Sequence, residues 1–234
     1  MGITNRVILG LTMSVALAFG FLHLLVPDAS HDFDRLHVFL FNLCAGGVIL
    51  QYFGLGRRWS PWLWVYLGLS LVYAVSAFFE HYLTPVILSV PMLVLVERVR
   101  ILRFGSFFPW SVFKPGSTSD KFLQAALLCL SIGLGIASLV MINNEFLHLF
   151  RLEKLTLDVF FLGYSFPLSL LTMSVMFHFA DDEGDRLYMV LKEVGFWSIT
   201  VGVILFFVFI IFEVTVIELL VANLLLVAVC MVYW

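Results

Sequence analysis

Long apolar runs, separated by short polar segments, extend over almost the whole chain. A helix needs about 20 mostly apolar residues to cross the hydrocarbon core of a bilayer. The fourth such run contains Pro85 and Pro91. A very tight turn joins the seventh and eighth runs, which could alternatively form one bent segment. The pattern predicts an all-α, polytopic integral membrane protein with eight transmembrane helices, at 7–26, 36–55, 62–80, 83–102, 122–143, 157–179, 195–213 and 215–233.

The composition indicates that the lipid bilayer is the main partner. Of 234 residues, 62% are hydrophobic and 12% are charged, and the mean hydropathy is +1.06. A soluble domain has about 45–50% apolar and about 25% charged residues, so this much apolar surface cannot be hidden in a core of this size. The net charge of −3 gives no indication of a nucleic-acid partner. The three cysteines are isolated from one another and predict neither a disulfide framework nor a zinc site.

Basic residues are divided unevenly between the two sides of the predicted membrane domain. The N-terminus, the loops at 56–61, 103–121 and 180–194, and the adjoining helix ends carry ten of the 13 Lys and Arg residues. Loops rich in Lys and Arg remain in the cytoplasm. The chain is therefore predicted to lie in a prokaryotic inner (cytoplasmic) membrane, with both termini in the cytoplasm.

An internal repeat relates the two halves of the sequence. A Phe-Leu-His-Leu motif that contains His23 returns around His148, and both Glu80 and Glu213 follow a tryptophan by 16 residues. An even number of helices in each half makes such repeats parallel, related by an axis along the membrane normal. The sequence therefore predicts two parallel four-helix repeats, 1–103 and 122–234, joined by a cytoplasmic linker at 104–121.

Ionisable side chains near the extracytoplasmic face form the candidate site. Such groups in or near a membrane are costly unless they are paired or hydrated, and they therefore indicate function. Imidazoles with a carboxylate suit a transition metal, and two opposed imidazoles suit haem iron. Histidine beside a carboxylate can also pass protons to a quinone. The alternative to a functional site is that these side chains are simply hydrated residues at the ends of helices. The candidate ligands of haem or metal are His23, His37, His81 and His148, with Glu80 and Glu213 as catalytic, proton-handling groups.

Other polar and small residues have structural interpretations. Gly46-Gly47 predicts a close approach between helices, with a flat cofactor-binding surface as the alternative. Asn42 and Gln51 are amides that we expect to hydrogen-bond across helices. The first outer loop contains three aspartates, Asp28, Asp32 and Asp34. Roles in turns and helix caps fit them better than roles as ligands do.

Two resemblances of arrangement point to metal or haem chemistry. His23 at the end of one span and Asp34-x-x-His37 at the start of the next resemble nickel/cobalt permeases of the hydrogenase-accessory type, whose His-Pro and Gly-x-Asp-His motifs the chain lacks. Two sets of four helices with histidines near one surface are similar to haem A synthases, whose larger outer loops and glutamate motifs are missing. Both resemblances concern architecture alone.

The leading hypothesis is a membrane-embedded redox protein that binds haem or a transition metal and exchanges electrons or protons with a quinone-like partner. A small transition-metal or solute transporter is the first alternative. It requires polar residues at mid-membrane depth, and the sequence offers few of them, which counts against it. The candidates there are Asn42, Gln51, Ser165, Thr172 and Asn223. A metal-dependent enzyme acting on lipid headgroups, or a structural subunit assembled with other membrane subunits of a respiratory complex, are further alternatives.

Overall fold

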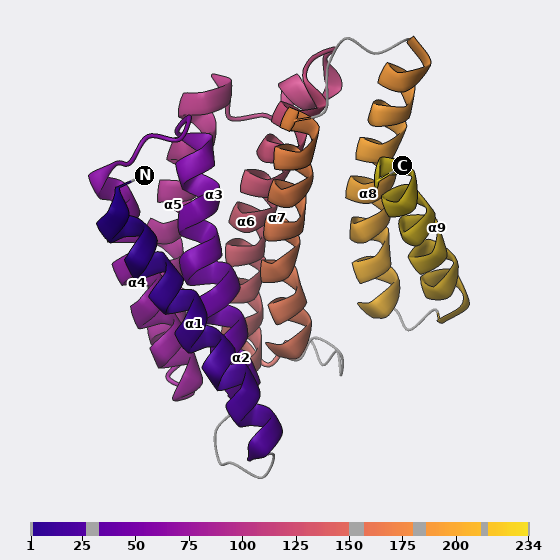
Figure 1. Ribbon diagram of the computed structural model, residues 1–234. Coiled ribbons are helices and arrows are strands. Elements are labelled where there is room, and N and C mark those ends of the chain that lie inside the picture. Colours follow the sequence, from indigo (N-terminus) through magenta and orange to yellow (C-terminus); the bar gives the residue numbers. More distant parts are fainter. Residues whose placement is uncertain (1, 27–32, 150–156, 180–185, 212–214, 234) are drawn as a thin grey trace.

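The computed structural model describes residues 2–26, 33–149, 157–179, 186–211 and 215–233, and every regular element in these ranges is helical (Figure 1). The helices run alternately up and down, so their connections lie at two ends of the bundle. We call the end with the connections at 55–60 and 105–117 the linker end, which is uppermost in Figure 1. The opposite end, where α4 meets α5, is called the histidine end.

Each of the eight predicted runs coincides with a helix in the described part of the chain. The second run is one continuous helix, called the second helix below, in which a π-helical stretch interrupts the α-helical geometry. A short 3-10 turn, η2 (Trp110–Phe113), lies in the linker. The bounds are α1 Ile3–Leu25; the second helix with α2 Phe33–Val38, η1 Phe39–Gly46 and α3 Gly47–Gly54; α4 Pro61–Phe78; α5 Leu83–Phe104; α6 Thr118–Ile142, continued by the π turn η3 Asn143–Leu147; α7 Leu157–Phe179; α8 Arg186–Ile211; and α9 Thr215–Tyr233.

Among the described residues, five helices are long and apolar enough to cross a membrane: Ile3–Leu25, Phe33–Gly54, Pro61–Phe78, Thr118–Leu147 and Tyr188–Phe206. Several such helices in one chain are compatible with an integral membrane protein. The prolines of α5 do not break it. Pro85 lies in the first helical turn, where a missing N–H leaves no bond unmade, and Pro91 lies inside the helix, which continues past it to Phe104.

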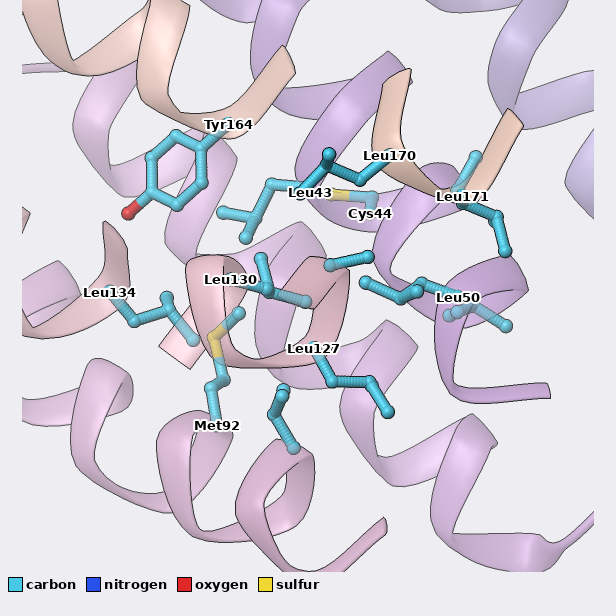
Figure 2. Packing of buried hydrophobic residues seen from close by; sticks show 14 of the residues in the cluster. Leu43, Cys44, Leu50, Met92, Leu127, Leu130, Leu134, Tyr164, Leu170 and Leu171 are labelled. Atoms are coloured by element: carbon cyan, nitrogen blue, oxygen red, sulfur yellow. The ribbon is translucent and has the colours of Figure 1, made fainter. Parts of the chain in front are cut away.

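The core lies where the second helix, α5, α6 and α7 meet (Figure 2). Helix α6 is central, because every residue from 121 to 127 is buried. A helix that is buried on all sides has neighbours on all sides. Helix α1 is peripheral, with only Leu9 and Ala16 buried among its residues. Figure 2 shows the convergence of leucines from three helices: Leu43 and Leu50 from the second helix, Leu127, Leu130 and Leu134 from α6, and Leu170 and Leu171 from α7.

Helices α8 and α9 pack on each other, and α8 joins the rest of the bundle at the linker end. The Phe196 ring meets the Phe122 ring of α6 edge-on, with centroids 4.9 Å apart. Close by, the Lys121 ammonium lies 2.5 Å from the Glu193 carboxylate. One aromatic contact and one ion pair therefore fix α8 against the buried face of α6.

The pairing of helices is similar in the two predicted halves, but their arrangement differs. In the first half α1 packs on the second helix and α4 packs on α5, and in the second half α6 packs on α7 and α8 packs on α9. However, α4 also packs on the second helix, whereas α8 packs on α6. The two-repeat arrangement therefore remains a prediction from the sequence.

Candidate functional site

The four histidines predicted as ligands lie at the histidine end in different settings. His23 is in the last turn of α1 and is half-buried, whereas His81 and His148 are exposed. His148 follows the π turn η3 with a left-handed backbone, φ 50°. Glu80, also exposed, has φ 60° in the turn between α4 and α5. Glu213 lies outside the described residues, as do Asp28 and Asp32.

His37 has a structural role in the described geometry. Its Nδ1 lies 2.8 Å from the Ala16 carbonyl oxygen on α1, which fits an Nδ1–H that donates to that oxygen. Its ring also lies against Gly20, where an added Cβ would come within 3.0 Å of Nδ1. His37 therefore joins the second helix to α1 across a narrow gap, in which a side chain larger than that of Gly20 would press on the imidazole.

The turn before α5 is held to the second helix by a polar contact. The Arg35 guanidinium donates to the Tyr82 hydroxyl, with Nη1 and Oη 3.1 Å apart. Partial burial raises the pKa of the Tyr82 phenol, and the charges of Glu80 and Glu145 act in the same direction, whereas Arg35 opposes the shift. Tyr82 is therefore a neutral hydrogen-bonding group at physiological pH, and it is unsuited to act as a base.

Among the described residues, no three His, Cys, Asp or Glu side chains are grouped so that they could hold a metal ion. The structure therefore does not bring His23, His37, His81 and His148 together as one ligand set. Haem or metal binding stays a prediction that rests on the sequence.

Spectroscopy of the purified protein tests that prediction. If His37 is a ligand, the protein shows a visible absorption band or a bound transition metal, and His37→Phe abolishes it. His178→Phe is the matched control, because His178 is exposed at the linker end of α7, and this variant keeps the signal. A folded wild-type protein that is colourless and free of metal contradicts the haem and metal hypothesis.

A second constellation, which the histidine analysis did not include, lies half-way between the two ends. The Asn42 amide on the π-helix η1 donates to the Ser165 hydroxyl on α7, with the two atoms 2.9 Å apart. This contact confirms that Asn42 bonds across helices. The same expectation for Gln51 is wrong, because its Nε2 donates to the Gly47 carbonyl of its own helix, 3.3 Å away.

Three buried tyrosines extend this constellation towards α4. The Tyr66 hydroxyl donates to the Leu43 carbonyl within η1, at 3.3 Å. The Tyr73 and Tyr164 hydroxyls lie 3.2 Å apart and share one hydrogen bond. The Phe39 ring packs edge-on against both of these rings, with centroids 5.5 Å and 5.8 Å away. We call the set of polar residues between α4, the second helix and α7 the polar seam: Asn42, Tyr66, Tyr73, Tyr164 and Ser165.

Two of the three helices that carry the seam, the second helix and α7, are irregular at this depth. Residues 39–46 form a π-helix, a geometry that is rare and frequent at functional sites. Pro167 lies inside α7, where its missing N–H leaves the carbonyl four residues earlier without its usual donor. Backbone irregularity of this kind within a membrane is tolerated where it is buried in protein or lines a cavity.

Gly46 and Gly47 bring their neighbours unusually close to the π-helix. A Cβ on Gly46 would lie 2.0 Å from Leu168 Cδ1, and a Cβ on Gly47 would lie 2.5 Å from the Tyr66 hydroxyl oxygen. This confirms the close approach predicted for the Gly46-Gly47 pair. A narrow gap with no room for a water molecule remains beside Asn42, Gly46, Gly47 and Pro167.

A buried ion pair lies at the linker end. The Arg100 guanidinium is 1% exposed, and its Nε lies 2.9 Å and 3.1 Å from the two carboxylate oxygens of Glu97, which is 12% exposed. Its Nη2 also donates to the Phe107 carbonyl in the linker. A buried guanidinium is tolerated only when it is paired and hydrogen-bonded, so this pair ties the linker backbone to α5.

Comparison with protein-family models, with curated proteins and with solved structures found no match for the chain. Function must therefore be argued from the seam itself. The sequence indicates Asn42 and Ser165 separately as polar residues at mid-depth, but it neither pairs them nor points to the tyrosines. The signal that could have drawn attention to this place is the pair of interruptions, Gly46-Gly47 in the second helix and Pro167 in α7.

Proposed function

We propose that this protein is a small membrane transporter that binds an uncharged, hydrogen-bonding solute at the polar seam. The observation that carries the proposal is the Asn42–Ser165 hydrogen bond between two interrupted helices. Secondary transporters bind their substrates near the bilayer midplane, at helices whose regular geometry is broken. Polar groups buried inside a membrane bundle are expensive and therefore indicate function.

The positions of these residues along their helices support a midplane site. Asn42 lies near the middle of the second helix, Phe33–Gly54, and both Ser165 and Pro167 lie near the middle of α7, Leu157–Phe179. With the predicted orientation, the basic linker end faces the cytoplasm and the histidine end faces outwards. The seam would then lie about equally far from both surfaces.

The predicted repeat gives the seam a symmetric place in the chain. The second helix is the second span of the first predicted half, and α7 is the second span of the other. Interrupted hydrophobic segments at corresponding positions of two repeats are the best indication of a transporter binding site in a sequence. On this proposal the two halves move against each other around the Asn42–Ser165 contact.

The chemistry of the gap indicates the class of solute. Among the described residues that line it, Asn42 is polar and none carries a charge. The seam beside it offers hydroxyls and an amide, which bind neutral polar molecules through hydrogen bonds. The gap is closed, so the solute would enter when the contacts of Leu168 and Tyr66 with the two glycines loosen.

Removing the Asn42 amide is expected to impair transport. In Asn42→Leu, we expect the protein-dependent permeation of glycerol or urea into proteoliposomes to fall about fivefold or more, because one hydrogen bond is worth about 1 kcal/mol. Stopped-flow light scattering measures this rate. The matched control is Asn223→Leu, since Asn223 is exposed on α9 and donates to Leu219 of its own helix. Equal loss in both variants would contradict a role for the seam.

A further inference from the structure

Four large aromatic side chains project from the linker between α5 and α6. Phe107 is 63% exposed, Phe108 62%, Trp110 63% and Phe113 66%. Aromatic side chains gathered so closely on one exposed segment indicate a surface that is covered by a partner or by membrane. The linker therefore has a role beyond joining two helices.

The linker is held in a fixed shape that presents these rings. Arg100, buried in α5, donates to the Phe107 carbonyl, and the Ser106 hydroxyl donates to the Phe108 carbonyl at 2.5 Å. Further along, the Ser111 hydroxyl donates to the Gln124 side-chain oxygen of α6 at 2.6 Å. The linker is therefore tied to α5 through the Phe107 carbonyl and to α6 through the Ser111 side chain, and the Phe113 ring contacts the Trp197 ring of α8.

Exposed basic side chains lie on both sides of the aromatic residues along the chain. Arg98, Arg103 and Lys114 are all exposed, and the Arg98 guanidinium lies over the Trp62 ring, 4.6 Å from its centroid. Arg103 pairs with Asp120 at 3.0 Å, but both partners are largely exposed, so the pair screens the local charge only weakly. We call Arg98, Arg103, Lys114, Phe107, Phe108 and Trp110 the basic-aromatic surface.

We propose that the basic-aromatic surface is a binding site for an anionic phospholipid of the leaflet at the linker end. Tryptophan and other aromatic rings favour the headgroup region of a bilayer, and basic residues next to a transmembrane helix attract anionic lipids. The guanidinium groups and Lys114 hold the phosphate and headgroup, while the rings lie among the upper parts of the acyl chains.

Lipid fits this surface better than a soluble protein does because the surface continues into the apolar wall of the bundle. Ile101 and Leu102 on α5, 37% and 67% exposed, lie between Arg98 and Arg103. A helix with exposed apolar side chains at this position faces acyl chains. The same lipid molecule can therefore contact the wall with its chains and the arginines with its headgroup.

Quenching of Trp110 fluorescence tests this site in the full-length protein. The protein is reconstituted in phosphatidylcholine vesicles that contain the same small fraction of either brominated phosphatidylglycerol or brominated phosphatidylcholine. The difference between wild type and Trp110→Phe isolates the signal of Trp110. We expect the anionic lipid to be preferred about fivefold or more, since each basic residue near an anionic surface contributes a factor of about that size.

Charge variants separate specific binding from general adsorption. In the double variant Arg98→Gln/Arg103→Gln, we expect the preference for the anionic lipid to fall to about twofold or less. Arg6→Gln, which removes an exposed charge in α1, should leave the preference unchanged. Equal quenching of Trp110 by both lipids in the wild type overturns the proposal. Absence of quenching by either lipid also overturns it, because Trp110 would then be shielded by protein.

Discussion

Replacing Glu97 by leucine is expected to destabilise the folded protein by about 3–5 kcal/mol, because it leaves a buried guanidinium without its counter-ion. Arg100 is 1% exposed, and the two Glu97 oxygens accept its Nε–H and an Nη2–H. The Phe107 carbonyl is the remaining acceptor, and it cannot neutralise the charge. The linker and the junction of α5 with α6 are therefore expected to loosen first.

The free energy of unfolding in detergent micelles measures this effect. With the exposed Cys230 and the partly buried Cys129 replaced by serine, reaction of a thiol-specific dye with the completely buried Cys44 reports loss of the native core. The control is Arg103→Gln, which breaks the exposed Arg103–Asp120 pair and is expected to cost about 0–1 kcal/mol. In Glu97→Leu/Arg100→Met, part of the loss should be recovered. If Glu97→Leu costs no more than Arg103→Gln, the pair has no structural importance.

The second large effect is expected at Gly47. A methyl group there would lie 2.5–3.0 Å from three atoms of the Tyr66 ring and hydroxyl. Tyr66 is completely buried and its hydroxyl bonds to Leu43, so the ring cannot move aside without losing other contacts. Overpacking of this kind costs about 1–3 kcal/mol, and Gly47→Ala should also slow permeation because it holds the second helix away from α4.

Gly68→Ala is the matched control for Gly47→Ala. Gly68 is also inside a helix, but an added Cβ there meets no atom within 4 Å. Alanine is about 0.8–1.0 kcal/mol more favourable than glycine inside a helix, so this control should be neutral or stabilising. The unfolding free energies and the glycerol permeation rates of the two variants are compared side by side. Equal behaviour would mean that the contact with Tyr66 does not constrain the π-helix.

The positions of the helices could be predicted because run length and hydropathy alone determine them. The run interrupted by Pro85 and Pro91 forms the single helix α5, in which the first proline lies in the first turn and the second lies inside the helix without ending it. The π-helix could not be predicted. Residues 39–46 are apolar apart from Asn42, and nothing in this run of residues distinguishes a π-helix from an α-helix.

The candidate site was harder to predict because it depends on how each helix is rotated. The sequence shows only on which side of the membrane a residue is expected to lie, and on that basis His37 belongs with His81 and His148. In the structure His37 turns towards Ala16, and the other two lie in separate exposed turns. Asn42 was correctly expected to bond across helices, but its partner depends on the contact between the second helix and α7, 123 residues away in the chain.

The most direct test of the central claim is the permeability of proteoliposomes to small uncharged solutes. Vesicles with the purified wild-type protein and protein-free vesicles are mixed with glycerol or urea, and their re-swelling is followed by stopped-flow light scattering. If the polar seam is the substrate site of a transporter, vesicles with the protein re-swell faster than protein-free vesicles with at least one solute. This increase in rate is lost in Asn42→Leu but not in Asn223→Leu. Identical rates with and without the protein for both solutes would contradict it.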